Sequence, residues 1–537
     1  MTDTSTTNQF TQTVAARPVG GSTDAEPPVR HVCIVGGGTA GWMTALLLAR
    51  SSYGPRLQVT VLESPQVATI GVGEGSTPWL RGFFDSVDIE EAEWMPACNA
   101  TYKNGVTFKD WSTKPGYESY FHPFASMLDN MTMGQFIHNV HARLNNADVH
   151  AHPDRYFIAA ELARTDKGPK PAHQFPFDVW YGYHFDSTLL GQFLRRKSVE
   201  RGVRHLERHV TQVLLDQHGD IDRLQLDGDE TLAADFFVDC TGFSSLLIGK
   251  ALETPFKSYS DNLFNDSAIA LPSPIDAPLS SQTVSTALKH GWAWKIPLTN
   301  RYGNGYVYSS AHCSADEAET ELRQHLGLLD ADVKPVHLKM RVGSMAKHWN
   351  RNCVAIGLAQ GFIEPLEATA LLLVQRTAMA LVEALEAGDL SEAAQTRFNA
   401  AIHRHFEGTR DFIVAHYKTN SRTDTDYWRA NAANTNLSDP LRELLGTWLA
   451  RQPLIGGLQK GRFGYGFSTM SWYALLAGVG VFPDEGLRPA TAAEAQYDPA
   501  TIDNLLSRSA LNFQDHRELL RNIPPKPTER ALHLYQW

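Results

Sequence analysis

Apolar residues near the N-terminus fall into short segments whose patterns alternate between strand and helix. The segment His31–Val35 is almost entirely apolar, which is typical of a strand buried on both faces. Residues Thr39–Arg50 repeat apolar side chains along one side of a helix, and Leu57–Leu62 predict a second strand. Two strands joined by a helix form the unit of a parallel sheet. The pattern therefore predicts an α/β fold.

Later segments of the same kind return the chain to this sheet. A helix is expected near Ser187–Gly202, and buried strands at Phe236–Gly242 and Cys353–Gly357. The ending of Phe236–Gly242, where an apolar strand stops at a small residue and a glycine, resembles the second strand-turn of flavin-dependent monooxygenases. This resemblance implies a Rossmann-like FAD-binding domain of the flavin monooxygenase type over residues 30–365. Residues 1–29 are expected to form a disordered tail. Within the domain, interleaved strand-rich and aromatic-rich segments at about 85–185 are expected to form the substrate pocket. Residues 366–537 are expected to form a mainly helical substrate-binding domain.

An aromatic strand is predicted at Trp292–Pro297. Its period of two places Trp292, Trp294 and Ile296 on one face as an apolar wall. Pro297 ends the strand because it cannot extend the hydrogen-bonded ladder. Such a wall either fills a core or controls what reaches a neighbouring cofactor, and both roles can hold at once.

The turn between the first strand and helix carries the glycines of a dinucleotide site. Gly36 permits the tight turn, Gly38 lets a pyrophosphate approach the backbone, and Gly41 lets helix and strand pack closely. Glu63, at the end of the second strand, is placed to accept the ribose hydroxyls. Further cofactor contacts are expected at the first helical turn, a glycine-rich loop and the later strand end, namely at Thr39, Ala40, Gly73 and Gly357.

A helix is predicted to begin within Glu364–Ala370. Pro365 suits a first helical turn, and glutamates near a helix N-terminus complement its dipole. The same backbone N–H groups would also form an anion site beside an acid. The residues alone leave the structural and the functional interpretation equally open.

Composition narrows the function classes. The chain of 537 residues, with 43% hydrophobic and 10% aromatic residues, is long enough for more than one core. A net charge of −11 argues against nucleic acid or an anionic membrane as partner. Five cysteines without paired spacing favour a reducing compartment, and no metal-ligand cluster is evident. Without a secretory signal or a membrane-spanning run, we expect a cytoplasmic protein.

Taken in order, these motifs resemble the flavin-dependent halogenases of the tryptophan halogenase family. The resemblance rests on the glycine turn, Gly71–Glu74, the Trp292–Pro297 strand and Glu364–Thr369, and it extends from His31 to about Pro483. The two-tryptophan motif is its most specific part, because related monooxygenases generally lack it.

The resemblance implies a chemistry and a set of partners. Members use oxygen, chloride or bromide, and reduced FAD from a separate flavin reductase to generate hypohalous acid, which reaches a lysine beside a small aromatic substrate. Lys103 matches that lysine, although by itself it would be interpreted as a solvated surface residue. Its ammonium would hold the oxidant, or its neutral amine would form a haloamine. A homodimer is compatible with this resemblance.

The second catalytic residue implied by the resemblance is Glu367, which would polarise the oxidant or take the ring proton. Thr369 and Ala370 match the halide site, where backbone N–H groups bind the anion. Tryptophan halogenases carry Gly at the second position. An Ala there keeps the donor, but a positive φ would be costly.

The resemblance also bears on the substrate. Trp292 and Trp294 would keep the substrate away from the flavin, so that only a small oxidant passes. His122 and Phe124 match ring-contacting positions, and Phe467 replaces a stacking tryptophan. Residues 454–467 lack the tyrosine pair and the carboxylate that hold the amino-acid group of tryptophan, which favours an indole-like or phenolic ring.

Two other functions remain open from the sequence. An aromatic flavin monooxygenase would insert oxygen without halide and would itself oxidise NAD(P)H. A flavin-binding protein with a degraded site would give no product with any halide, and the presence of Lys103 and Glu367 counts against it.

Overall fold

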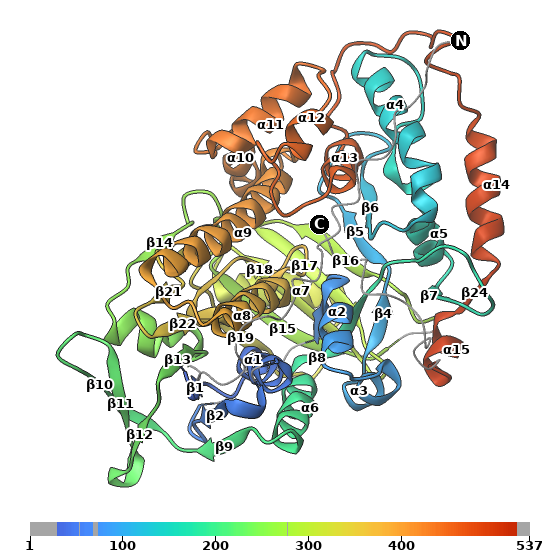
Figure 1. The fold of residues 1–537 in the computed structure, drawn as a ribbon. Helices are drawn as coiled ribbons and strands as arrows, with labels where there is room; N and C mark the ends of the chain where they lie inside the picture. The colour runs from blue at the N-terminus through green and yellow to red at the C-terminus, as the bar shows by residue number, and fades with distance from the viewer. Residues whose placement is uncertain (1–28, 53, 68–72, 276–277, 524–537) are drawn as a thin grey trace, which may run out of the picture.

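The computed structural model describes residues 29–52, 54–67, 73–275 and 278–523 (Figure 1). The expected disordered tail therefore lies outside the described residues, except for Val29. Residues 70–72 of the predicted glycine-rich loop also lie outside them.

A six-stranded sheet forms the nucleotide-binding core in the lower part of Figure 1. All neighbouring strands are parallel except the edge pair β21–β22. Helices α1 (Thr39–Arg50), α6 (Ser187–Glu200) and α8 (Ala370–Ala387) are packed together, with α1 between the other two. In spatial order the strands are β21 (Trp349–Asn350), β22 (Cys353–Ala355), β13 (Phe236–Asp239), β1 (His31–Val35), β2 (Gln58–Glu63) and β9 (Arg204–Glu207). The predicted Rossmann-like α/β fold is confirmed.

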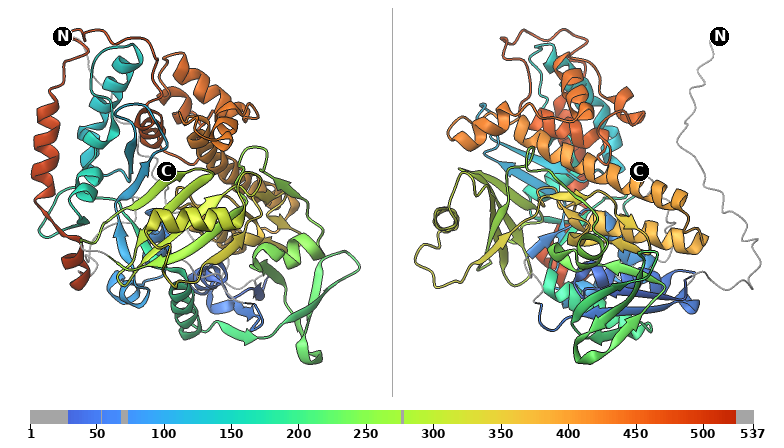
Figure 2. Two further views of the ribbon diagram at one scale, coloured as in Figure 1. Left: turned by 180° about the vertical axis from the view of Figure 1, so that it is seen from behind. Right: turned by 90° about the vertical axis from the view of Figure 1, so that its left-hand side faces the viewer.

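A seven-stranded sheet lies above the nucleotide-binding core. Its spatial order is β19 (Val336–Lys339), β15 (Ser267–Ser273), β18 (Tyr302–Tyr308), β17 (Gly291–Pro297), β16 (Thr283–Leu288), β5 (Gly105–Lys109) and β6 (Ser119–Pro123). Seen from behind in Figure 2, helix α7 (Ala315–Leu326) lies over one face. Ala293 packs on that side, whereas Trp292 and Trp294 belong to the main core, so the predicted alternation along the aromatic strand is confirmed.

Four smaller sheets complete the strand structure. The one closest to the predicted chemistry has the order β3 (Gly73–Gly75), β8 (Gly182–Asp186), β4 (Thr101–Lys103). The other three comprise β10 (Val210–Leu215), β11 (Ile221–Leu226) and β12 (Thr231–Ala233); β14 (Phe256–Ser258), β20 (Gly343–Met345) and β23 (Gly361–Phe362); and β7 (Lys167–Pro171) with β24 (Phe513–Asp515).

The remaining α-helices form two groups. Those of the first half are α2 (Trp79–Ser86), α3 (Glu91–Ala97), α4 (Met133–Leu144) and α5 (Ile158–Arg164). Those of the second half are α9 (Glu392–Lys418), α10 (Asp426–Ala433), α11 (Asp439–Leu449), α12 (Ile455–Gln459), α13 (Thr469–Gly478), α14 (Pro499–Ala510) and α15 (His516–Arg521). Short 3-10 helices cover Gly54–Arg56, Leu128–Met131, Pro153–Arg155, Asp227–Asp229, Gly242–Ser244 and Gly357–Ala359, and a π-helix covers Leu246–Ala251.

The helix predicted to begin within Glu364–Ala370 is α8, but Pro365 does not lie in its first turn as expected. The helix begins at Ala370, and Glu364–Thr369 form an irregular segment. Ala368 has φ 55°, a left-handed conformation that a helix cannot contain. The apolar run after this residue is helical as predicted.

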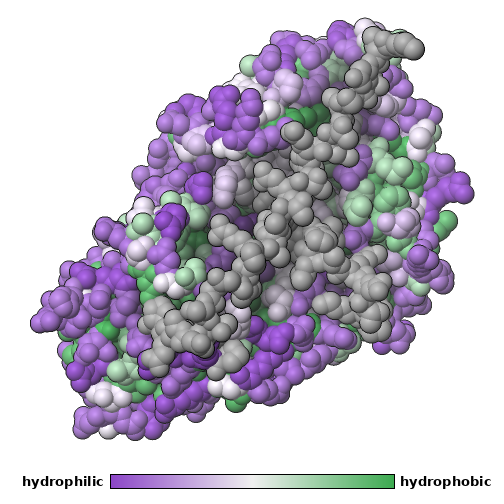
Figure 3. Space-filling view, viewed as in Figure 1, coloured by the Kyte–Doolittle hydropathy of each residue, from purple (hydrophilic) through white to green (hydrophobic). Residues whose placement is uncertain are grey.

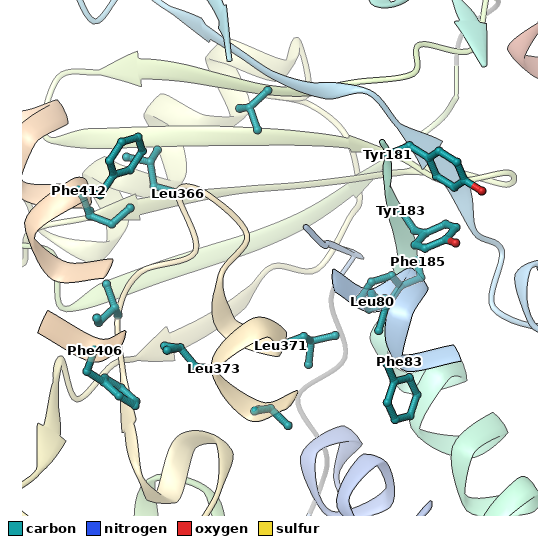
Figure 4. Close-up of a cluster of buried hydrophobic side chains, with 14 of the residues drawn as sticks. Leu80, Phe83, Tyr181, Tyr183, Phe185, Leu366, Leu371, Leu373, Phe406 and Phe412 are labelled. Carbon is teal, nitrogen blue, oxygen red and sulfur yellow. The ribbon is translucent and has the colours of Figure 1, made fainter. Parts of the chain in front are cut away.

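The main core is continuous from α9 to α2. In Figure 4, Phe412 and Leu366 lie at one side of the cluster, and Tyr183, Phe185 and Phe83 at the other. Hydrophilic residues predominate on the described part of the face seen in Figure 3. Among the described residues, no helix has the length and apolar character needed to cross a membrane.

Candidate functional site

Lys103 is the last residue of β4 and is only 1% exposed. Its Nζ lies 5.3 Å from the centre of the Phe124 ring, and a Cβ built on Gly75 would approach it to 3.3 Å. Burial lowers the pKa of Lys103 to about 8, although the charge of Glu367 opposes this shift. The lysine is therefore not a solvated surface residue.

The edge of β4 that carries Lys103 is fixed from the far end of the chain. The backbone N–H of Tyr102 donates to Nε2 of His516 at 3.1 Å. Nδ1 of His516 lies 3.2 Å from the carbonyl oxygens of Leu279 and Ser280, so it carries the proton and leaves Nε2 as acceptor. Burial lowers the pKa of His516 to about 4, which keeps this ring neutral.

Glu367 is buried between two histidines. Nδ1 of His122 lies 2.9 Å from each carboxylate oxygen of Glu367, and Nε2 of His416 lies 3.1 Å from Oε1. The His416 contact has ion-pair distance but not the direction of a good hydrogen bond. Burial alone would raise the pKa of Glu367, but His122 and then His416 outweigh it and hold this pKa at about 2.

The orientation of His416 is set by a hydrogen bond within its own helix. Nδ1 of His416 lies 2.9 Å from the carbonyl oxygen of Phe412, which only accepts, so Nδ1 is a donor. This hydrogen bond leaves Nε2 facing the carboxylate of Glu367.

The expected halide residues lie at the start of α8. Thr369 is the N-cap residue, and its Oγ1 is buried without a hydrogen-bond partner among the described residues. The first N–H groups of any helix lack acceptors within it, so this end has the donors that an anion needs. Ala370 does not have a positive φ, so the conformational cost expected for an alanine there does not arise. The left-handed residue is Ala368, two positions earlier.

The glycine turn has the geometry of a pyrophosphate site. Cβ atoms at Gly36 and Gly41 would lie 2.1 Å from the Cys240 oxygen and 2.0 Å from the Gly36 oxygen, so neither position accepts a side chain. A Cβ at Gly38, the N-cap of α1, would meet nothing within 4 Å. The open backbone at a helix N-terminus fits the phosphates of a dinucleotide.

The other expected cofactor residues surround this turn. Glu63 accepts from Nε2 of His205 at 2.9 Å and lies against Gly37. Gly357 has φ 74°, and a Cβ there would lie 2.7 Å from that of Ala40. In the same region, Thr39 Oγ1 donates to the Ser187 carbonyl at 3.4 Å, and Gly73 packs against Gly303. These residues fit FAD.

The tryptophan wall is fully built into the core. Trp292 and Trp294 are 2% and 8% exposed, with ring centres 6.2 Å apart. A Cβ at Gly305 of β18 would lie 2.0 Å from the Trp294 ring, so this ring occupies the space of a missing side chain. Beside Trp292 lies Glu364, whose pKa burial raises to about 7.

The expected substrate residues meet on α9. The ring of Phe467 stacks on Phe412 with centres 3.7 Å apart and planes 8° apart. The ring centre of His122 lies 5.8 Å from that of Phe412. The structure thus places His122, Phe467, Phe124 and both expected catalytic residues around one aromatic region, in which Phe124 and Phe467 are half-buried.

The sequence interpretation missed two groups of polar residues. One is His416, the second neighbour of Glu367. The other is a buried network in which Asn265 Nδ2 donates to Glu364 Oε2 at 2.7 Å and lies 2.8 Å from Tyr417 Oη. The spacing of His416 and Tyr417 on α9 offers no signal, because each partner lies far away in the sequence. In the described part of the chain, no three His, Cys, Asp or Glu side chains converge as in a metal site.

Comparison with known families identifies relatives along most of the chain. The sequence model of the tryptophan halogenase family matches residues 31–495. Tryptophan 6-halogenase SttH of Streptomyces toxytricini is 38% identical over 495 residues, which cover 88% of this chain and 92% of the relative. Tryptophan 7-halogenase RebH of Lentzea aerocolonigenes is 36% identical over 486 residues, covering 85% and 90%.

Solved structures show the same fold. The crystal structure of SttH has a TM-score of 0.78 at 36% identity and covers 91% of this chain and 99% of its own. BrvH, a flavin-dependent halogenase from Brevundimonas sp. BAL3, has a TM-score of 0.78 at 32% identity, covering 93% and 100%.

Proposed function

The chain belongs to the tryptophan halogenase family and is a flavin-dependent halogenase, and on this premise we propose that it halogenates an electron-rich aromatic such as indole. The proposed halide is chloride or bromide. Reduced FAD from a separate reductase, when bound, supplies the electrons that activate oxygen for halide oxidation. We propose a cytoplasmic enzyme, and a homodimer is compatible with this proposal.

One observation carries this proposal. A buried lysine and a buried carboxylate belong to the same aromatic region: Lys103 lies against Phe124, and Glu367 is hydrogen-bonded to His122. A Cβ built on Gly75 of β3 would lie 3.3 Å from Nζ of Lys103 and 3.7 Å from the Cβ of Ala368. The lysine and the Glu367 segment are thus neighbours, as delivery of an oxidant to a bound ring requires.

Lys103 holds the oxidant in this mechanism. The ammonium donates a hydrogen bond to the oxygen of hypohalous acid and leaves the halogen directed at the ring. As ring electrons form the carbon–halogen bond, the oxygen–halogen bond breaks and the oxygen leaves as hydroxide. Lys103 protonates it to water. With a pKa of about 8, most of the lysine is in this cationic form at pH 7.

Glu367 takes the proton from the halogenated ring carbon. Transfer of this proton restores aromaticity and balances the proton that Lys103 has donated. A carboxylate with a pKa of about 2 is a weak base in isolation. The rings of His122 and His416 hold its oxygens in place until the cationic ring forms. In this mechanism the wall of Trp292 and Trp294 keeps the substrate ring away from FAD.

The decisive experiment supplies a purified reductase, FAD, NADH, oxygen and bromide to the protein with indole. Mass spectrometry should show brominated indole with its paired isotope peaks, and no hydroxylated product. Lys103→Ala should lose the product while FADH2 reoxidation continues, and Lys109→Ala, at an exposed position, should retain activity. Oxygenated indole formed without halide would instead identify a hydroxylase, and an absence of product from any aromatic would refute the proposal.

The form in which Lys103 acts can be read from the pH profile. If the ammonium acts, kcat should fall as the pH rises through about 8. A rate that rises through the same range would favour the haloamine.

A further inference from the structure

Arg376 is a largely buried cation without a counter-ion. Its Nε is buried and has no hydrogen-bond partner, and no acidic side chain of the described residues lies within ion-pair distance of its guanidinium. Proteins rarely bury an arginine in this way, because the lost hydration is normally replaced by a carboxylate or phosphate. The missing partner points to a ligand that carries negative charge.

Aromatic and cationic neighbours surround this arginine. Its guanidinium lies 4.4 Å from the centre of the Trp79 ring, and Nη1 lies 3.4 Å from Nε2 of His405. Tyr465 contacts the His405 ring at 5.0 Å between centres and lies 5.5 Å below the guanidinium of Arg404. Arg404 also has no acidic partner within the described part of the chain. We call these five residues the cationic cluster.

The cluster does not face the expected pyrophosphate. Val374, two residues before Arg376 on α8, points toward Gly357 of the glycine turn region. Residues two apart on a helix lie on nearly opposite sides. Arg376 therefore points toward α2 and α9, away from the phosphates that a dinucleotide would bring.

Helix α9 connects the cluster to the proposed substrate region. From the N-terminal end of α9, the His405 ring contacts the Tyr465 ring, and Gly408 packs against the Tyr465 backbone. Farther along the helix, Phe412 stacks on Phe467, and His416 contacts Glu367. His405 and Phe412 are seven residues apart, which places them on the same side of α9 at a separation of about 10 Å. The cationic cluster thus lies at one end of this row of α9 contacts, and Glu367 lies at the other end.

The segment that covers this row is also cationic. Residues 454–467 contain Lys460 and Arg462 and no acidic residue, and only Arg462 is paired, with Glu443. We propose that the cationic cluster binds a carboxylate carried by the aromatic substrate, so that the enzyme prefers ring acids with a flexible side chain. This inference deepens the proposed function and rests on it.

The test compares kcat/KM for bromination of indole, tryptamine and the 3-acetic, 3-propionic and 3-butyric acids of indole. The wild-type enzyme should prefer the acids to tryptamine, and the butyric acid should gain most because its carboxylate reaches farthest. Arg404→Ala and Arg376→Gln should lower the ratio of butyric acid to indole about tenfold. Arg404→Glu should shift the preference toward tryptamine. Arg397→Ala, which removes an exposed arginine from the outer end of α9, is the matched control.

The outcomes separate this inference from the proposed function. The cationic cluster does not bind the substrate carboxylate if indole is brominated but the acids are never preferred. The same conclusion holds if the Arg404 variants leave the kcat/KM ratio of the butyric acid to indole unchanged. If the variants raise the KM for bromide with neutral indole as substrate, the cluster serves the halide and the proposal is wrong. An absence of brominated product from every compound would refute the proposed function itself.

Discussion

Replacing Lys103 with Met should remove halogenation and at the same time stabilise the protein. The substitution keeps the length and packing of the side chain and removes a charge that burial disfavours. The pKa of Lys103 is lowered from 10.5 to about 8, which corresponds to a cost of about 3 kcal/mol at about 1.4 kcal/mol per pKa unit. At pH 7 the variant should therefore resist urea unfolding by about this amount more than the wild type.

The stability difference between Lys103→Met and the wild type should depend on pH. A lysine whose pKa is depressed by folding has its full stability above the unfolded pKa of 10.5 and loses it as the pH falls through about 8. The advantage of Lys103→Met should accordingly shrink by about 2 kcal/mol between about pH 7 and pH 9.5.

Urea unfolding of both proteins at several pH values measures this difference, because all other titrations cancel between them. Lys109→Met, at an exposed position, is the control and should show no such trend. A Lys103→Met protein that is less stable than the wild type at pH 7, or whose advantage is independent of pH, would refute the account of a buried, desolvated ammonium.

Three further predictions concern the neighbouring residues. Ala368→Gly should be more stable than Ala370→Gly by about 1–2 kcal/mol in thermal unfolding, because only Ala368 has a left-handed conformation; equal stabilities would contradict this. Burial raises the pKa of Glu364 from 4.5 to about 7. The contribution of Glu364 to the folding stability is therefore fully present below pH 4.5 and is lost as the pH rises through about 7. Glu364→Gln should remove this loss, seen as a flatter pH dependence of urea unfolding than in the wild type, and an unchanged slope would count against it. His416→Phe should lower ring halogenation at least about tenfold while a trap for free hypohalous acid still detects the oxidant; an unaltered kcat and pH profile would exclude His416 from the reaction.

The sequence predicted those features whose signal is local. The glycine turn and the Trp292–Pro297 strand each show their structure within a few residues, and both are confirmed. Pro365 was expected in the first turn of α8, but the left-handed conformation of Ala368 delays the helix to Ala370, although propensity favours an alanine in a helix. Lys103 was identified only through the family resemblance, since nothing in its immediate sequence indicates burial.

Contacts between distant segments were beyond the sequence argument. His416 of α9 meets Glu367 in the irregular segment before α8, and Arg376 of α8 meets His405 of α9. A single histidine or arginine on a helix predicts a solvated face as readily as a buried pair. Only the packing of α8 against α9 shows that these residues are neighbours.

The bond between Tyr102 and His516 joins residues 414 positions apart. Its consequence is that Lys103, the lysine proposed to hold the oxidant, acquires its final setting only after nearly the whole polypeptide has been made. Shortened proteins that stop before α15 would still contain every proposed catalytic residue, yet the strand that carries Lys103 would lose this contact at its edge. Truncations that remove α15 are therefore changes to the proposed site.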